Sequence, residues 1–426
     1  MSSVADKGVS VAVDQNEYLA EGAGTVDAVI TVAPGAAFVA AEQPPERVEI
    51  LIIDCSGSMG TGRKFDGARN ATLAALDVLP DGTRFAIVAG TSLAKLIYPT
   101  DVPSVPANPA TRAQARRHLD ALRPTGGTAM GTWLGLARQL SRKHDGAMVH
   151  AILLTDGKNE HEQPETLAAE IARSEGAFTC DCRGVGTDWR VEELRSIASA
   201  LHGSVDIVAD PDRLAEDFAA MAQSSMAKAI PELTLRVWTP AGASVRFVKQ
   251  VAPAIEDLTG RRRETGAQVG EYPLGAWGDE ERDYHLQVQL EPAAPGREKL
   301  AARVSVVAAG EVVGQGLVRA LWTTETGLSA RISRRVAHYT GQAELAQAVQ
   351  DGLAARDAGD VETATAKLRR AVELAAESGN EGTAKLLRGV VEVDERDGTV
   401  RLRKSVAAAD AMALDARSTK TKRVRS

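Results

Sequence analysis

The chain has 426 residues, of which 44% are hydrophobic, 25% are charged and 4% are aromatic. This length exceeds what one compact core usually holds, and the composition is that of a soluble globular protein, so we expect roughly two or three domains. The net charge of −7 disfavours a nucleic-acid partner, because non-specific binding to phosphates needs a basic surface. Only the residues from Lys420 onward form a basic run, and a short basic end is usually solvated.

The N-terminal sequence Met-Ser-Ser-Val-Ala-Asp-Lys contains no apolar run of the kind found in a signal peptide. No stretch reaches the ~18 apolar residues that a membrane-spanning helix needs, so we expect no membrane partner. Cys55, Cys180 and Cys182 are too few for a disulfide framework. Cys180 and Cys182 would share one face of a strand, where buried thiols explain them better than a redox or metal site. These features predict a cytoplasmic protein.

In chain order, the first elements are alternating apolar runs at 9–13 and 26–32, which predict two strands joined by a polar turn. A proline-containing connector spans 34–46. From 47 to 228, apolar strand-like runs alternate with helical patterns, which predicts a doubly wound, mostly parallel sheet with helices on both faces. We expect Thr111 to cap a helix. The expected strands are 48–53, 85–89, 95–98, 149–155, 177–185 and 205–208, and the expected helices are 64–79, 111–122, 131–143, 165–175, 189–201 and 211–228.

After Pro231 the pattern changes to period-two alternation, which predicts an all-β module over 230–325. The module shows about five strands, which is too few for a seven-stranded sandwich. The two N-terminal strands would complete it. We therefore expect a discontinuous β-sandwich formed by 5–45 and 230–325, with the α/β domain at 47–228 inserted between its parts.

Residues 327–392 carry Ala, Leu and Val at helical spacing in two segments, 333–358 and 361–378. They predict a helical hairpin, and the following 410–426 is expected to be a disordered basic tail. The fold class is therefore α/β: a doubly wound, mostly parallel sheet inserted in a β-sandwich and followed by a C-terminal helical region.

Three oxygen-rich segments are placed to meet at one edge of the expected sheet. Asp54, Ser56 and Ser58 follow the strand at 48–53, in the run Asp-Cys-Ser-Gly-Ser. Thr128 ends a Thr-Gly-Gly-Thr segment, and Asp156 follows the strand at 149–155. Ligands of open α/β sheets bind outside the carboxyl ends of the strands, near the switch in strand order. We therefore expect these five side chains to lie close together.

Two carboxylates and three hydroxyls suit Mg²⁺, which is a small, hard cation that prefers six oxygen ligands. Neutral hydroxyl ligands leave much of the cation's charge uncompensated, so such an ion should attract an external carboxylate. Neighbouring glycines allow the backbone to approach closely.

This three-part pattern over 47–228 resembles the von Willebrand factor type A domain and its metal-ion-dependent adhesion site. Asp54, Ser56 and Ser58 match the first ligand loop of that family, Thr128 matches the threonine of the second loop, and Asp156 matches the aspartate of the third. The resemblance implies a bound Mg²⁺, with Mn²⁺ or Ca²⁺ as substitutes. It also implies that an Asp or Glu side chain of a protein partner completes the metal shell. The whole chain looks like the multidomain cytosolic members found in bacteria.

The function that follows is a metal-dependent adaptor that binds proteins and catalyses no reaction. No nucleophile motif Gly-x-Ser-x-Gly and no phosphate-binding Gly-x-x-x-x-Gly-Lys-Ser/Thr loop is present. One alternative is a non-ATPase subunit of a chelatase-like or stress-signalling complex. Another is a Mg²⁺-dependent phosphohydrolase with Asp54 as nucleophile, although Ser56 then stands where a second aspartate is expected.

A simpler interpretation is that the five residues only cap turns and helices. Two carboxylates brought together without a metal would repel, and the cation nearest to Asp156 in the sequence, Lys158, could pair with only one of them. His161 could lie at the rim of the site, but a surface histidine is the simpler hypothesis. Asn159, Glu160 and Glu162 are explained in the same way, as part of a solvated loop.

Overall fold

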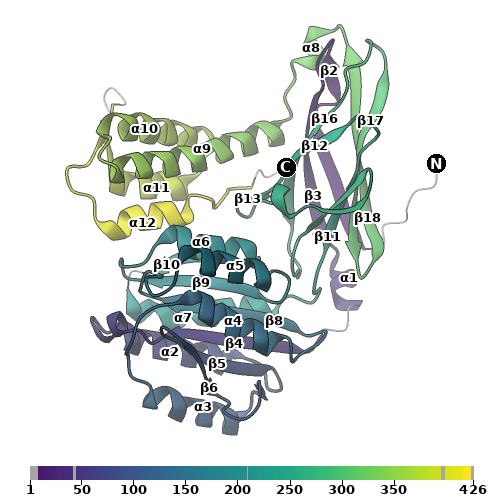
Figure 1. Cartoon of the computed structure of the whole chain (residues 1–426). Helices are drawn as coiled ribbons and strands as arrows, with labels where there is room; N and C mark the ends of the chain where they lie inside the picture. Colours follow the sequence, from purple (N-terminus) through teal and green to yellow (C-terminus); the bar gives the residue numbers. More distant parts are fainter. Residues whose placement is uncertain (1–7, 42–44, 209, 395–398, 424–426) are drawn as a thin grey trace. The chain divides into compact units, whose positions relative to one another are not determined.

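The computed structural model describes residues 8–41, 45–208, 210–394 and 399–423 (Figure 1). The chain divides into two compact units. The sandwich unit contains 1–43, 229–406 and 417–426, and the α/β unit contains 44–228 and 407–416. Residues 5–7 and 42–44 of the expected N-terminal segment, and 424–426 of the expected tail, lie outside the described residues.

The α/β unit is built on a seven-stranded sheet with the order β10-β9-β8-β4-β5-β6, to which β7 adds by pairing with β5. All pairs are parallel except those of β6 and β7 with β5. The long strands are continuous apolar runs because helices cover both of their faces. The strands are β4 (Arg47–Asp54), β5 (Arg84–Gly90), β6 (Ala94–Tyr98), β7 (Val105–Pro106), β8 (Met148–Thr155), β9 (Thr179–Val185) and β10 (Val205–Val208).

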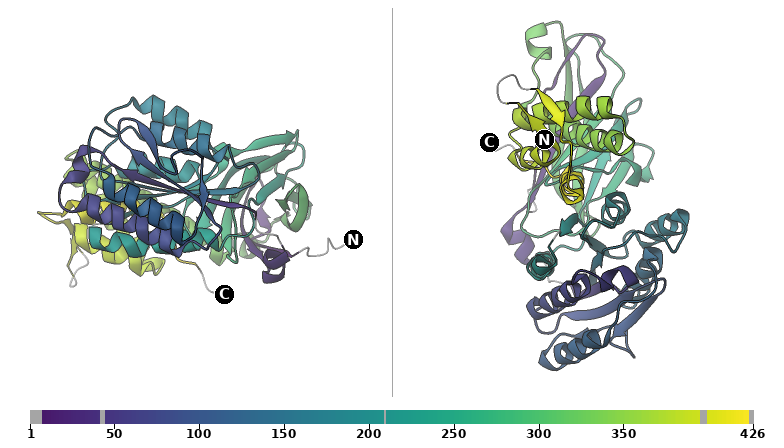
Figure 2. Two further views of the ribbon diagram at one scale, coloured as in Figure 1. Left: turned by 90° about the horizontal axis from the view of Figure 1, so that it is seen from below. Right: turned by 90° about the vertical axis from the view of Figure 1, so that its left-hand side faces the viewer.

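Helices flank this sheet on both sides, as Figure 2 shows. One buried core joins the sheet to α4, α5 and α6, and the other joins it to α2, α3 and α7. Asn108 caps α3 and forms a reciprocal capping box with Thr111, so Thr111 is the third residue of the helix and not its cap. The helices are α2 (Lys64–Val78), α3 (Pro109–Ala121), α4 (Met130–Ser141), α5 (Pro164–Ser174), α6 (Val191–Ala200) and α7 (Leu214–Met226).

The strand order places a topological switch between β4 and β8. The chain leaves β4 to build β5 on one side and returns to build β8 on the other. Ile53 of β4 pairs in parallel register with Leu154 of β8. The residues that follow these two strands, including Asp54 and Asp156, are therefore brought to one edge of the sheet.

The sandwich unit contains two large sheets with the orders β1-β3-β16-β12-β13 and β14-β15-β11-β17-β18-β2. Their shared core includes Trp277, Trp322, Tyr272 and Tyr284. The N-terminal strands β1 (Val9–Gln15), β2 (Tyr18–Ala20) and β3 (Thr25–Pro34) complete these sheets. The others are β11 (Thr234–Trp238), β12 (Ser244–Ala252), β13 (Glu256–Asp257), β14 (Arg263–Gly266), β15 (Val269–Pro273), β16 (Arg282–Gln289), β17 (Glu298–Ala308) and β18 (Glu311–Thr323).

The expected fold class is confirmed: a mostly parallel sheet is inserted in a β-sandwich, and helices follow. Residues 230–325 are all described, and they contain eight strands, more than the five expected. The additional strands β13, β14 and β15 have 2, 4 and 5 residues. Such short segments carry too few alternations to be recognised in a sequence.

The sandwich unit also contains α1 (Ala36–Ala41), α8 (Thr326–Ser329), α9 (Arg334–Asp357), α10 (Val361–Glu377), α11 (Glu381–Val390), β19 (Val391–Val393) and β20 (Val400–Leu402).

The prediction of a disordered tail at 410–426 is wrong for its described part. Residues Ala408–Arg417 form helix α12, in which Ala411, Leu414 and Ala416 are buried at helical spacing. The tail then pairs with the sandwich, where Arg423 binds the buried Asp283 carboxylate through two hydrogen bonds of 2.9 and 2.8 Å. The basic run therefore supplies a counter-charge inside the protein.

None of the described helices has the length and hydrophobicity needed to cross a bilayer.

Candidate metal centre

The structure brings the five predicted ligands together at the carboxyl edge of the sheet. Asp54 is the last residue of β4, Ser56 and Ser58 lie in the turn that follows, and Asp156 follows β8 directly. Thr128 lies in the loop before α4. Ser56, Ser58, Thr128 and Asp156 line a hollow of about 310 Å³, and Asp54 lies beneath them, fully buried.

Hydrogen bonds join the two carboxylates to the hydroxyls. Ser58 Oγ donates to Asp156 Oδ1 at 2.6 Å and lies 3.0 Å from Ser56 Oγ. Asp54 accepts from the Ser56 backbone N–H at 2.7 Å and from Thr155 Oγ1 at 2.5 Å. The bond from the Ser56 N–H to Asp54 caps the turn, as considered from the sequence. The expected helix caps by hydroxyls are not found, because neither the short helix at Gly57–Gly60 nor α4 has a side-chain bond from its N-cap residue.

The second loop is fixed to the first by backbone hydrogen bonds. Gly57 N–H donates to Gly126 O at 2.9 Å, and Thr125 N–H donates to Cys55 O at 2.6 Å. Gly126 has a φ of +77°, a conformation that favours glycine. A Cβ at Gly157 would lie 2.9 Å from Thr128 Oγ1. Glycine at that position therefore leaves the threonine hydroxyl free to face the hollow.

The donor set fits a small divalent cation. Mg²⁺ binds oxygen at about 2.1 Å in an octahedron, so neighbouring ligand oxygens are about 3 Å apart. The 3.0 Å between the oxygens of Ser56 and Ser58, and the 2.6 Å between those of Ser58 and Asp156, are close to that spacing. Among the described residues, no three His, Cys, Asp or Glu side chains cluster as a metal site, so any ion here would rely on hydroxyls.

Burial raises the pKa of Asp54 to about 6, although hydrogen bonds from Ser56 and Thr155 act in the opposite direction. Burial also raises the pKa of the neighbouring Cys55 thiol to about 12. The cysteine is therefore neutral and packs as a small apolar residue. A cation in the hollow would offset the cost of ionising Asp54.

The cation at Asp156 is Lys64 and not Lys158, which corrects the expectation from sequence proximity. Lys64 Nζ lies 2.7 Å from Asp156 Oδ2 and 3.0 Å from Asp188 Oδ2. Burial alone would lower the pKa of Lys64, but its hydrogen bonds to these two carboxylates outweigh that effect and raise it. Neither Lys64 nor Asp188 was recognised from the sequence. The only signal was that Lys64 begins the helix after the first ligand loop.

The loop after Asp156 is more than a solvated loop, because it caps α4. Asn159 Oδ1 accepts from Met130 N–H at 2.7 Å, and Glu162 Oε1 accepts from Gly131 N–H at 2.6 Å. These two bonds satisfy the first N–H groups of the helix that carries the second ligand loop. Glu160 lines the hollow.

His161 lies at the rim of the hollow. This agrees with the first of the two interpretations of its sequence position, a residue at the rim of the site. Its ring Nδ1 accepts from Thr128 N–H at 3.1 Å, and its backbone N–H donates to Thr128 O at 3.0 Å. A Cβ at Gly127 would collide with the imidazole ring at 2.3 Å, so the ring packs on that glycine. His161 therefore binds both backbone polar groups of Thr128 and fixes its position.

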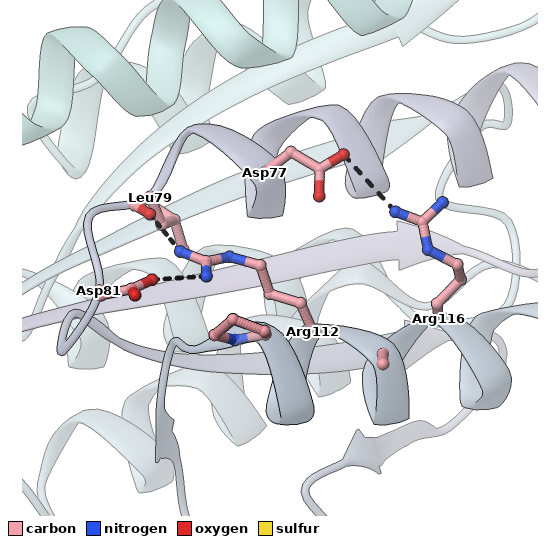
Figure 3. Close-up of a pocket in the computed structure, with 7 residues that line it drawn as sticks. Asp77, Leu79, Asp81, Arg112 and Arg116 are labelled. Atoms are coloured by element: carbon pink, nitrogen blue, oxygen red, sulfur yellow. Dashed lines mark hydrogen bonds and ion pairs between the residues drawn. The ribbon is translucent and has the colours of Figure 1, made fainter.

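A second hollow, of about 540 Å³, lies between α2 and α3 and is structural (Figure 3). Arg112 of α3 fills one side, where it donates to Leu76 O at 3.0 Å and Leu79 O at 2.5 Å. It also pairs with Asp81 at 2.6 Å. Its guanidinium thus satisfies carbonyls at the C-terminal end of α2. Arg116 pairs with Asp77 at 3.5 Å across the same gap.

Comparison with known proteins assigns the family. The family model described as von Willebrand factor type A domain matches residues 48–207, and the model described as von Willebrand factor type A C-terminal domain matches residues 373–418. No curated protein matches the chain. A solved structure of a von Willebrand factor type A protein from Catenulispora acidiphila is 48% identical, with a TM-score of 0.94, over 100% of this chain and 99% of that one.

The likeness extends across both units. The ArnB paralog VWA2 from Sulfolobus acidocaldarius shares the fold with a TM-score of 0.59 at 12% identity, over 96% of this chain and 98% of that one. The sandwich and the helices are therefore part of a shared architecture. With the inserted sheet, the ligand loops at its switch point and the full-length match at 48% identity, the chain belongs to the von Willebrand factor type A family.

Proposed function

We propose that this chain is a metal-dependent adaptor that binds proteins. In this proposal Mg²⁺ lies in the hollow at the ends of β4 and β8, where Ser56, Ser58 and Thr128 would ligate it. Asp54 and Asp156 would bind it or hold its waters. The bound ion supplies a Lewis-acidic position that accepts an Asp or Glu side chain of the partner. Mn²⁺ or Ca²⁺ would use the same oxygens.

The observation that carries this proposal is the convergence of neutral hydroxyls and two carboxylates on one open hollow. Neutral hydroxyl ligands leave part of the charge of a dication uncompensated, which favours an anionic ligand such as a carboxylate. The net charge of −7 argues separately against a nucleic-acid partner. The free, buried cysteines agree with a cytoplasmic location.

Hydrolysis of phosphate esters is less well supported. Asp54, the residue that would be the nucleophile, is 0% exposed. Both of its carboxylate oxygens accept hydrogen bonds, from Ser56 and Thr155. A nucleophile needs an oxygen that faces the substrate, so this carboxylate is better placed to support a cation.

Calorimetry with Mg²⁺ tests the metal site. We expect the wild type to bind one ion, and Asp54→Ala to lose at least about 100-fold in affinity because it removes one of two carboxylates. Asp66→Ala is the matched control, because Asp66 is an exposed aspartate on the nearby helix α2 and should leave binding unchanged. Absence of binding by the wild type, or equal binding by Asp54→Ala, would contradict the proposal.

The partner is tested by purifying the tagged full chain with Mg²⁺ or with a chelator, followed by mass spectrometry. We expect a protein that is retained with Mg²⁺ by the wild type and by Asp66→Ala, and that is lost with chelator or with Asp54→Ala. A partner retained equally by all samples would show that binding does not use the metal.

A further inference from the structure

Lys64 places a positive charge beside the proposed metal site. The ligand motif does not require this charge. It lies in the first turn of α2, and its ammonium bridges Asp156 Oδ2 at 2.7 Å and Asp188 Oδ2 at 3.0 Å. Its side chain is 14% exposed. Each oxygen of the Asp156 carboxylate thus accepts one hydrogen bond, Oδ2 from Lys64 and Oδ1 from Ser58 Oγ at 2.6 Å.

The position of Lys64 is built into the fold. Its aliphatic stem passes Gly186, where a Cβ would lie 3.3 Å from Lys64 Cε. Gly186 has a φ of +68° and directly precedes the loop that carries Asp188. The lysine is therefore held between the third ligand residue and the loop after β9, and it cannot swing freely into water as an exposed lysine does.

The charges around the hollow show what this lysine does. Asp54 and Asp156 contribute two negative charges, and Lys64 cancels one of them within hydrogen-bonding distance. The Asp188 side chain is 71% exposed, so water screens its charge more than that of the buried Asp156. Lys158 and Glu160 also line the hollow, but both are exposed and their opposite charges offset each other. Lys64 therefore leaves a dication in the hollow less neutralised than Asp54 and Asp156 alone would leave it.

We propose that Lys64 is a tuning residue that weakens metal binding and strengthens the hold of the bound metal on a partner carboxylate. The proposal rests on the adaptor function proposed above. Repulsion between the ammonium and the dication lowers the affinity for the metal. The same positive charge, added to that of the ion, increases attraction for an incoming anion.

Opposite changes in two affinities distinguish this role from simple support of the loop. The Mg²⁺ affinity of the full chain is measured by calorimetry at low ionic strength, and acetate is then titrated into the metal-loaded protein. We expect Lys64→Met to bind Mg²⁺ about 10-fold more tightly and acetate several-fold more weakly, the order expected for removing one nearby, partly buried charge. Lys64→Arg keeps the charge and should restore both affinities toward wild-type values.

Lys158→Met is the matched control, because Lys158 lines the same hollow but has no ion pair to Asp156 among the described residues. Its effect on Mg²⁺ affinity should stay within about 2-fold. Asp188→Asn provides a second variant. It removes a carboxylate that lines the hollow and leaves the lysine less neutralised, and both changes should weaken Mg²⁺ binding, together by about 3-fold.

The results separate this inference from the adaptor function. If the wild type binds no Mg²⁺, the proposed function fails first. If the wild type binds Mg²⁺ and a folded Lys64→Met binds it equally or more weakly, or binds acetate more tightly, the tuning role is overturned. If Lys64→Met does not fold, tighter or unchanged Mg²⁺ binding by Asp188→Asn overturns it.

Discussion

Each end of the sheet in the α/β unit holds a pair of carboxylates, but the two ends use them differently. At the amino end, His150 Nδ1 lies 2.7 Å from Glu49 and Nε2 lies 3.0 Å from Asp181. The histidine joins two carboxylates into a closed cluster. At the carboxyl end, Asp54 and Asp156 contact hydroxyls that face a hollow of about 310 Å³.

The difference teaches which features indicate a binding site. Burial and paired carboxylates are present at both ends of the sheet, so neither distinguishes the site. What distinguishes the carboxyl end is the set of neutral hydroxyls that face an open space beside incompletely neutralised carboxylates. The amino end should therefore govern stability, and the carboxyl end should govern metal binding.

The largest expected effect is on stability, from His150→Ala. Removing the imidazole leaves the fully buried Glu49 without its cation, whereas Asp181 is 21% exposed and keeps its hydrogen bonds from Ser204. Leaving a buried charge unpaired in this way costs about 3–5 kcal/mol. Urea denaturation would measure this loss. The Mg²⁺ affinity of the folded variant should stay within about 2-fold of wild type. Equal stability of variant and wild type would show that the cluster is not a structural cation site.

The two ends should also respond to pH in opposite ways: the amino end loses stability as the pH rises, and the carboxyl end loses Mg²⁺ affinity as the pH falls. Burial lowers the pKa of His150, but Glu49 and Asp181 outweigh this effect and raise it to about 9. A raised histidine pKa stabilises the fold fully below its ordinary value of about 6.5, and that stability, on the order of 3 kcal/mol, is lost as the pH rises through 9. The pH dependence of unfolding in wild type and His150→Ala checks this, because the loss should be smaller in the variant.

At the carboxyl end the change comes at low pH. Asp54, with its pKa raised to about 6 by burial, must lose its proton before a cation binds. Mg²⁺ affinity should therefore fall by up to about 10-fold for each pH unit below 6. Calorimetry from pH 5 to 8 measures it. Constant affinity over that range would mean that Asp54 takes no part in binding.

A smaller effect is expected from Gly157→Ala, which places a methyl group 2.9 Å from Thr128 Oγ1. The hydroxyl would have to turn away, so we expect about a 10-fold loss of Mg²⁺ affinity with a stability change below about 1.5 kcal/mol. Gly60→Ala is the matched control, because its nearest neighbour would lie at an ordinary 3.8 Å. Equal Mg²⁺ affinities of the two variants would argue against Thr128 as a ligand.

The smallest expected effect comes from Thr155→Val, which removes the 2.5 Å hydrogen bond to Asp54. A hydrogen bond to a carboxylate contributes about 1.5–3 kcal/mol, but the adjacent bond from the Ser56 backbone remains. We therefore expect a loss of stability of about 1 kcal/mol, measured by thermal unfolding. An unchanged Tm would mean that Asp54 is already held well enough by Ser56.

The ligand residues were predictable from the sequence because they follow strands at fixed offsets. Asp54 and Asp156 each follow an apolar run, and parallel strands bring such positions to one edge. Lys64 and Asp188 were not predictable, because their contact joins a helix start to a distant loop and has no characteristic spacing. The same holds for Arg423, whose partner Asp283 lies 140 residues earlier in the chain.

The helix at Ala408–Arg417 shows a second limit of the sequence. Its buried residues Ala411 and Leu414 follow helical spacing, but alanine is a weak apolar signal and the segment precedes a basic end. Only its packing in the α/β unit reveals the role, with Arg195 bonded to Asp415 at 2.6 Å. Short terminal helices of this kind gain their stability from tertiary contacts more than from propensity.

The central claim is that the hydroxyls and carboxylates at the ends of β4 and β8 hold a divalent cation. A crystal structure of the full chain grown with Mn²⁺, with anomalous data, tests it most directly. We predict one anomalous peak in the hollow, bonded to the oxygens of Ser56 and Ser58. A Mn²⁺-saturated crystal with its peak elsewhere, and with Lys64, Ser58 and Asp156 bonded only to one another, would contradict it.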